Sequence, residues 1–119
     1  MPHVILVEDD ALVRTLIAHH AMDSNWRVTT LKDGRELERM MLDEPADLLL
    51  IDLGLPHVDG LSLVENLRAK DITTPVLIIT AYELPHLLTT ITGAGANDLL
   101  QKPFDPDDLI ARMERLLAA

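Results

Sequence analysis

The residues of this sequence that are best suited to chemistry stand directly after short strand-like runs. The four runs end in Glu8-Asp9, Asp52, Thr80 and Lys102. If the runs are parallel strands, these polar residues gather at one edge of the sheet, because ligands in such folds bind beyond the carboxyl ends of the strands. The sequence therefore predicts a small cleft that holds at least three carboxylates, one hydroxyl group and one ammonium group.

Such a cluster of carboxylates needs a compensating positive charge. Two carboxylates about 4 Å apart repel each other by roughly 4 kcal/mol at an effective dielectric constant of about 20. Lys102 supplies one positive charge, and a divalent cation would supply the rest. Mg²⁺ suits the site best, because it binds carboxylates, keeps water ligands and leaves positions for phosphate oxygens. The absence of cysteine and the scattered histidines disfavour a softer metal.

The elements that must position these residues alternate between strand-like and helix-like patterns. Five runs are predicted strands: 4–7, 28–31, 47–51, 76–79 and 99–100. Strands that are apolar on both sides belong to parallel sheets covered on both faces, and alternating strands and helices form right-handed crossovers. We therefore expect an α/β fold with a doubly wound, five-stranded parallel sheet of the flavodoxin-like (βα)₅ type, in a single domain over residues 1–119.

Capping signals indicate where the predicted helices begin. Asp10 is expected to cap the first helix, whose apolar face is formed by Leu12, Val13, Leu16 and Ile17. A second helix is predicted from the acid-x-x-Glu spacing of residues 33–36, and Pro85 is expected to open the fourth. Asp105 followed by Pro106 is a strong start signal for the last helix.

Composition excludes several classes of function. The chain has 119 residues and a formal net charge of −10, so nucleic acid or an anionic membrane would repel it. At 48% hydrophobic residues it can bury a core. The absence of cysteine excludes disulfides, thiolate metal sites and a cysteine nucleophile. Because no apolar run is long enough to span a membrane and the first residues do not look like a signal peptide, we expect a cytoplasmic domain.

The motifs taken together resemble the receiver domain of bacterial two-component response regulators. The matching stretches are Val-Glu-Asp-Asp at 7–10, Leu-Ile-Asp-Leu-Gly-Leu-Pro at 50–56 followed by Asp59-Gly60, Ile-Thr-Ala at 79–81, and Lys-Pro-Phe at 102–104. Each motif is weak alone, but their order and spacing are specific and cover essentially the whole chain. The resemblance implies a phosphorelay protein that assists its own phosphorylation and dephosphorylation, and not an enzyme.

The resemblance implies an acceptor residue and its metal ligands. Asp52 would be the phosphoacceptor, attacking the phosphorus of a phosphohistidine on a partner histidine kinase or phosphotransfer protein. Asp9 would bind Mg²⁺ directly, and Glu8 would act through water. Asp52 itself and the backbone carbonyl of Gly54 would complete the protein's share of the metal ligands.

The resemblance also implies residues that respond to the phosphoryl group. Lys102, whose bond to the next proline is a candidate cis peptide, would pair with the phosphoryl oxygens, and Thr80 would hydrogen-bond them. Ala81, Tyr82 and Leu99 are expected to transmit or tune the switch. Leu99 replaces the aromatic residue usual in the family, which reflects either ordinary core packing or signalling through the loop after Thr80 and the fourth helix. Tyr82 either shields the phosphoryl group from water or packs on the surface.

Two other classes compete with this interpretation. An aspartyl-nucleophile phosphatase of the haloacid-dehalogenase type also uses Asp, Thr, Lys and Mg²⁺, but it expects a second acid where this chain has Gly54. A flavodoxin-like binding module would need a phosphate-binding loop after the first strand, and the sequence has none there.

The expected output partner is a downstream effector protein or a linked output domain. Asp98, Asp108 and Arg112 resemble part of the charged dimer face of winged-helix-linked regulators. The predicted fourth helix has no basic residue that could form ion pairs with the acidic residues of this face. The sequence therefore leaves the oligomeric state open, together with the cognate kinase, the pathway and whether the domain stands alone.

Overall fold

The computed structural model describes residues 1–83 and 85–119. Over these residues, strands and helices alternate in this order: β1 (His3–Val7), α1 (Ala11–Asp23), β2 (Arg27–Leu31), α2 (Leu37–Asp43), β3 (Leu48–Asp52), α3 (Gly60–Ala69), β4 (Val76–Thr80), α4 (Leu87–Ala94), β5 (Asp98–Gln101) and α5 (Pro106–Ala118). The five strands are parallel and form one sheet in the order β2-β1-β3-β4-β5. The predicted doubly wound (βα)₅ fold is confirmed.

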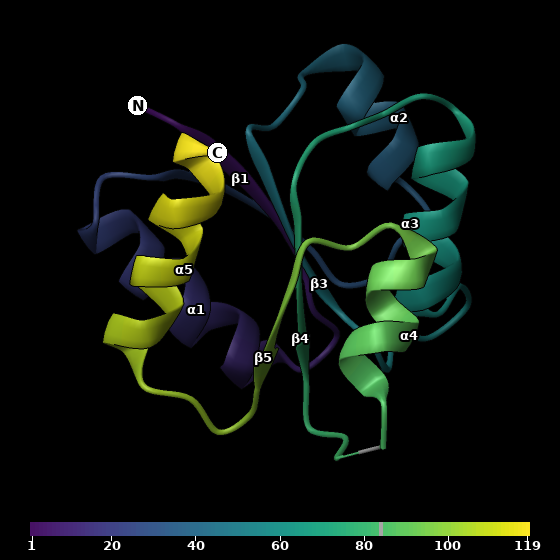
Figure 1. Cartoon of the computed structure of the whole chain (residues 1–119). Helices are drawn as coiled ribbons and strands as arrows, with labels where there is room; N and C mark the ends of the chain where they lie inside the picture. Colours follow the sequence, from purple (N-terminus) through teal and green to yellow (C-terminus); the bar gives the residue numbers. More distant parts are fainter. Residues whose placement is uncertain (84) are drawn as a thin grey trace.

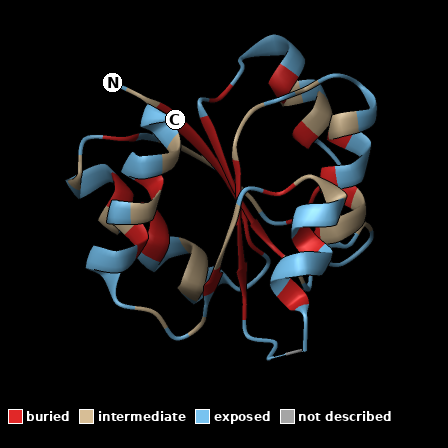
Figure 2. Cartoon of the chain, viewed as in Figure 1, coloured by how far each residue is buried: buried red, intermediate tan, exposed pale blue. Residues whose placement is uncertain are grey.

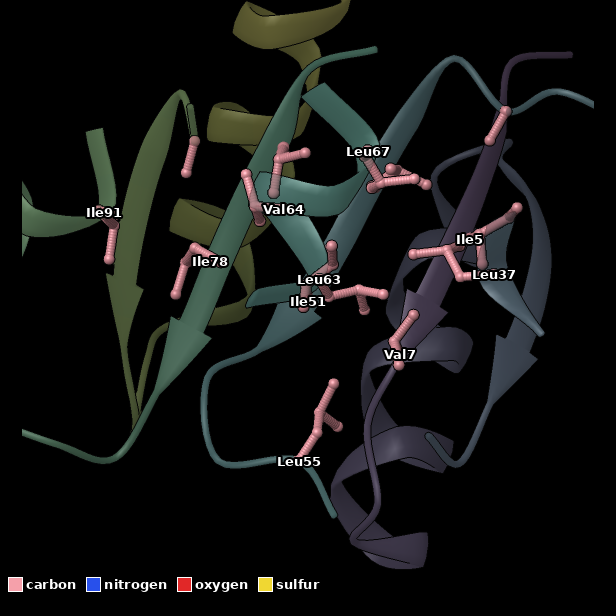
Figure 3. Packing of buried hydrophobic residues seen from close by; sticks show 14 of the residues in the cluster. Ile5, Val7, Leu37, Ile51, Leu55, Leu63, Val64, Leu67, Ile78 and Ile91 are labelled. Atoms are coloured by element: carbon pink, nitrogen blue, oxygen red, sulfur yellow. The ribbon is translucent and has the colours of Figure 1, made fainter. Parts of the chain in front are cut away.

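Helices cover both faces of the sheet, with α1 and α5 on one side and α2, α3 and α4 on the other (Figure 1). The strands β1, β3 and β4 are buried along their whole length (Figure 2). Successive side chains of a strand point to opposite faces, so each apolar strand feeds two cores. Ile5, Ile51 and Ile78 pack toward α2, α3 and α4 (Figure 3), whereas Leu6 and Leu50 pack toward α1 and α5.

The register of the strands brings their carboxyl ends to one level. Val7 pairs with Ile51, Asp52 with Ile79, and Thr80 with Gln101. The strand order also reverses between β1 and β3, which is where ligands bind in sheets of this kind. The sheet therefore delivers the polar residues that follow its central strands to one shared edge.

Two of the predicted helix starts are confirmed. The carboxylate of Asp10 accepts hydrogen bonds from the backbone N–H groups of Leu12 (2.9 Å) and Val13 (3.1 Å), which caps α1. The carboxylate of Asp105 caps α5, and Pro106 is the first residue of that helix. Neither α1 nor any other helix of the described residues has the length and apolar character needed to cross a membrane.

The predicted apolar face of α1 is partly wrong. Leu12 and Leu16 are 69% and 51% exposed, and the buried residues of the helix are Ile17, Ala18 and Ala21. Ala18 and Ala21 pack in the same core as Val4 and Leu6 of β1, and this orientation of the helix leaves the two leucines on its outer side.

The predicted start of α2 is wrong. The helix begins at Leu37, and Glu36 makes no capping hydrogen bond. The carboxylate of Asp33 instead accepts hydrogen bonds from the backbone N–H of Arg35 (3.0 Å) and from its guanidinium group (3.0 Å and 3.2 Å). A local arginine thus takes the carboxylate that would have capped the helix.

The fourth helix also begins later than predicted. Pro85 lies before α4, which starts at Leu87 after His86, a residue in the left-handed region at φ 59°. Gly95 ends the helix at φ 113°, a conformation that favours glycine. Gly93 lies within the helix.

Candidate functional site

Three carboxylates meet at the carboxyl edge of the sheet. Oxygen atoms of Glu8, Asp9 and Asp52 all lie within 4.8 Å of one another. Glu8 is fully buried and Asp52 nearly so, whereas Asp9 is exposed. The structure thus brings together the acidic residues that the sequence placed in one cleft, and it leaves one side of the cluster open to solvent.

Lys102 connects the same cluster to β5. Its ammonium nitrogen lies 2.5 Å from Glu8 Oε1 and 3.4 Å from Asp52 Oδ2. The backbone N–H of Lys102 donates to the carbonyl of Thr80 (2.7 Å), which fixes the lysine beside the end of β4. The Lys102–Pro103 peptide bond is cis.

Charge in the cleft is not balanced. Burial, followed by hydrogen bonding to Asp52, raises the pKa of Glu8 to about 7, although Lys102 acts in the opposite direction. Burial also acts to lower the pKa of Lys102, but its hydrogen bond to Glu8 and the nearby carboxylates outweigh burial and raise it. One ammonium group therefore faces three carboxylates, and a divalent cation with a preference for oxygen ligands fits this set.

The turn that carries Glu8 and Asp9 is held by Arg14 on α1. The Arg14 guanidinium donates to the backbone carbonyl of Glu8 (2.8 Å) and to that of Asp9 (3.4 Å). Sequence reasoning missed this residue, because a basic side chain in the first turns of a helix is ordinarily a solvated charge. An arginine one turn past an acidic strand end is the signal that points to it.

Asp52 is held by the chain that follows it. The backbone N–H of Gly54 donates to Asp52 Oδ1 (3.3 Å). Gly60 begins α3 against the end of β3, where an added Cβ atom would lie 2.4 Å from the Asp52 carbonyl oxygen and 2.9 Å from Leu53 Cα. Only glycine allows this approach of the two backbone segments. Asp59 caps the same helix by accepting from the N–H of Ser62 (2.9 Å).

Thr80 and Tyr82 border the cleft from β4. The Thr80 hydroxyl oxygen is fully buried and accepts the backbone N–H of Tyr82 (3.0 Å), so its own proton remains to be donated. Tyr82 is 52% exposed, and a Cβ atom on Gly54 would lie 3.2 Å from its phenol oxygen. Ala81 is exposed, and Leu99 is half-buried against the core that faces α3 and α4.

The charged residues of the suggested dimer face bind one another within the chain. Arg112 contacts Asp98 (3.0 Å) and Asp108 (3.2 Å). Arg115 also contacts Asp98 (3.0 Å). This network joins β5 to α5.

The fold and the site together indicate a class of protein. The domain is a doubly wound α/β domain with an aspartate, an acidic pair, a threonine and a lysine at the carboxyl edge of its sheet. Phosphoryl transfer needs such positioning and charge neutralisation more than covalent chemistry. The arrangement therefore suits a class of proteins that position a phosphoryl group at the edge of a parallel sheet.

Comparison with known proteins identifies the family. Residues 4–114 match the family described as the response regulator receiver domain. The chain belongs to this family and is a receiver domain of two-component response regulators. The family assignment supports the receiver interpretation and not the haloacid-dehalogenase alternative.

The chain is similar to a curated relative and to solved receiver domains. It is 38% identical to the virulence transcriptional regulatory protein PhoP of Salmonella choleraesuis over 117 residues, which is 98% of this chain and 52% of the relative. The Francisella response regulator 1452 receiver domain superposes with a TM-score of 0.94 at 30% identity, covering 99% and 98% of the two chains. The BeF3-activated receiver domain of Klebsiella pneumoniae RstA gives 0.92 at 30% identity, covering 98% and 99%. The chain spans about half the length of the curated relatives it matches.

Proposed function

We propose that this receiver domain takes a phosphoryl group from a phosphohistidine of a histidine kinase or phosphotransfer protein onto Asp52. The observation that carries the proposal is the placement of the Asp52 carboxylate, whose Oδ2 lies 3.4 Å from Lys102 Nζ while Oδ1 accepts the N–H of Gly54. In the step, a carboxylate oxygen of Asp52 bonds to phosphorus and the phosphorus–nitrogen bond breaks, so that the electron pair of that bond returns to the imidazole of the donor histidine.

The donor set supports Mg²⁺ as the cofactor. Asp9, Asp52 and the Gly54 carbonyl would hold the ion, and Glu8 would contact it through water. All of these ligands are hard oxygen atoms, and the cluster sets three carboxylates against the single ammonium group of Lys102. When bound, Mg²⁺ supplies positive charge that offsets the charge of the phosphoryl oxygens.

Lys102 and Thr80 act on the phosphoryl group once it arrives. The Lys102 ammonium group, already 3.4 Å from Asp52, pairs with a phosphoryl oxygen. The Thr80 hydroxyl donates its proton to another, because its oxygen is occupied by the Tyr82 N–H. The added charge thereby biases the position of the loop that follows Thr80.

The switch is proposed to run through this loop and α4. Ala81 and Tyr82 lie in the loop, and Leu99 packs beneath it on β5 without the hydroxyl group of a tyrosine. Tyr82, which lies beside Gly54, shields the phosphoryl group from attacking water.

The domain acts by changing protein contacts and not by turning over a substrate of its own. Its proposed partners are a histidine kinase and an effector protein or linked output domain, since the chain covers only 52% of the PhoP relative. A net charge of −10 argues against nucleic acid as a direct partner. We place the reaction in the cytoplasm, which agrees with the absence of cysteine.

Intact-mass analysis with a small phosphodonor tests the proposal. The wild-type domain should gain one phosphoryl group in the presence of Mg²⁺ and none in EDTA. Asp52→Asn should gain none, while Asp43→Asn, which alters an exposed aspartate at the end of α2, should match the wild type. Undiminished phosphorylation of Asp52→Asn would refute Asp52 as the acceptor. Turnover of a phosphate ester without any kinase would revive the phosphatase alternative.

A further inference from the structure

Among the described residues of the loop after β4, the backbone of Tyr82 makes two hydrogen bonds to the sheet. The Tyr82 N–H donates to the Thr80 hydroxyl oxygen (3.0 Å). The Tyr82 carbonyl accepts a hydrogen bond from the side-chain amide of Gln101 (2.9 Å). The second bond crosses from β5 to the loop and joins residues that are 19 positions apart in the sequence.

These bonds restrain the backbone from which the Tyr82 ring extends. The side chain is 52% exposed, so burial does little to fix it. It nevertheless lies against Gly54, with the phenol oxygen 3.2 Å and ring carbons 3.6 Å and 3.7 Å from the position of a Cβ atom there. Gly54 is two residues from Asp52 and donates to its carboxylate. Because burial supplies little restraint, the hydrogen bonds of the Tyr82 backbone are the contacts that hold the origin of the ring beside Gly54.

We propose that Gln101 is a positioning residue that holds Tyr82 as a cover over the phosphoacceptor site and thereby sets the lifetime of the phosphoryl group. The inference rests on the proposed function, since it concerns the hydrolysis of phosphorylated Asp52. In that step a water oxygen bonds to phosphorus, the bond between phosphorus and the Asp52 oxygen breaks, the carboxylate is regenerated, and the water proton leaves with inorganic phosphate. A ring over Gly54 restricts the approach of this water.

The position of Gln101 in the fold supports this role. It is the last residue of β5, is paired with Thr80 and precedes Lys102. Its side chain is exposed, so its contact with the loop is not a by-product of core packing. Leu99, which is half-buried and lies two residues before Gln101 on β5, has no polar side-chain group that could bind the loop. The end of β5 therefore positions Lys102 and, through Gln101, also the loop that carries Tyr82.

The first test measures the ring directly in the unphosphorylated protein. Tyr82 is the only tyrosine of the chain, so its ring protons are unambiguous in an NMR spectrum. Wild-type protein should show a nuclear Overhauser effect between the Tyr82 ring and the Gly54 Hα protons. Gln101→Met and Gln101→Glu, which lack the amide donor, should lose it. Asn66→Met, a change of another exposed side-chain amide on α3, should keep it. Persistence of the effect in both Gln101 variants would overturn the proposal.

The second test measures the lifetime of the phosphoryl group. Loss of one hydrogen bond shifts an equilibrium by a factor of about 2 to 10, so Gln101→Met should hydrolyse its phosphoryl group about 2 to 10 times faster than wild type. Tyr82→Ala should also accelerate hydrolysis. The double variant should be no faster than Tyr82→Ala, because a positioning residue has no effect once its target is removed. Independent, multiplying effects would overturn the proposal, as would an unchanged rate in Gln101→Met.

The two tests separate this inference from the proposed function. If wild-type protein is not phosphorylated at Asp52, the proposed function fails, and the NMR result still decides whether Gln101 places the ring. If Asp52 is phosphorylated and Gln101→Met hydrolyses at the wild-type rate, only the role of Gln101 fails.

Discussion

Replacing Glu8 by glutamine should make the metal-free domain more stable at alkaline pH. Burial raises the pKa of the Glu8 carboxyl from 4.5 to about 7 in the folded state. Between these values the folded protein binds a proton that the unfolded chain has released. The free energy of unfolding therefore falls as pH rises from about 4.5 to about 7, and it stays low above that range.

The size of the effect follows from the shift. One pKa unit corresponds to about 1.4 kcal/mol, so ionised Glu8 costs the folded protein on the order of 3 kcal/mol. The raised value already contains the favourable effect of Lys102, so no separate correction for that ion pair is needed. A glutamine has the hydrogen-bonding capacity of the protonated acid, because its carbonyl can accept from Lys102 and its amide can donate to Asp52. Glu8→Gln should exceed the wild type by less than about 1 kcal/mol at pH 5 and by up to about 3 kcal/mol at pH 8.

Urea denaturation in EDTA at pH 5, 6, 7 and 8 measures this difference. Histidines and other groups titrate in both proteins, so the difference between variant and wild type isolates Glu8. Glu65→Gln, a change of an exposed glutamate on α3, is the matched control and should follow the wild type at every pH. Addition of Mg²⁺ should stabilise the wild type more at pH 8 than at pH 6 and should stabilise Glu8→Gln less. A difference between variant and wild type that does not grow with pH would refute the reasoning.

Two further changes test the packing around the site. Gly60→Ala should lower the free energy of unfolding by about 1–3 kcal/mol, because its Cβ atom meets the backbone of β3 at 2.4 Å; urea denaturation measures it, and an unchanged midpoint would contradict the close approach. Leu16→Ser should change that free energy by less than about 0.5 kcal/mol, since the side chain is exposed, and a loss comparable to that of a core leucine would restore the predicted α1 face.

The fold and the composition of the cleft could be predicted because they depend on strong, local patterns. Strands such as Leu48–Ile51 are apolar on both sides, which permits only a covered parallel sheet. The parallel strands then bring Glu8, Asp52, Thr80 and Lys102 to one edge, whatever the details of the helices. The caps at Asp10 and Asp105 were predictable for a similar reason, since each carboxylate binds N–H groups two or three residues ahead.

The errors arise where two local solutions compete. The apolar residues of α1 form two overlapping stripes, and the choice between them depends on how closely Ala18 and Ala21 approach the sheet. The carboxylate of Asp33 could serve a helix terminus or the guanidinium group two residues away, and the spacing alone favours the wrong one. The first choice depends on contacts that exist only after the chain has folded, and the second on a local contact that competes with helix capping.

Arg14 and Gln101 are harder to recognise from sequence than the residues of the carboxylate cluster. Each side chain donates a hydrogen bond to a backbone carbonyl. Every residue has a backbone carbonyl, so the acceptor leaves no signature in the sequence. The sequence left open whether Leu99 reflects ordinary packing or a different route of signalling through the loop. The structure supplies a physical connection for the second option, because Gln101 joins β5 to the loop two residues beyond Leu99. A link made from a side-chain amide to a carbonyl needs no aromatic residue, so the replacement at Leu99 need not uncouple the phosphoacceptor site from β5.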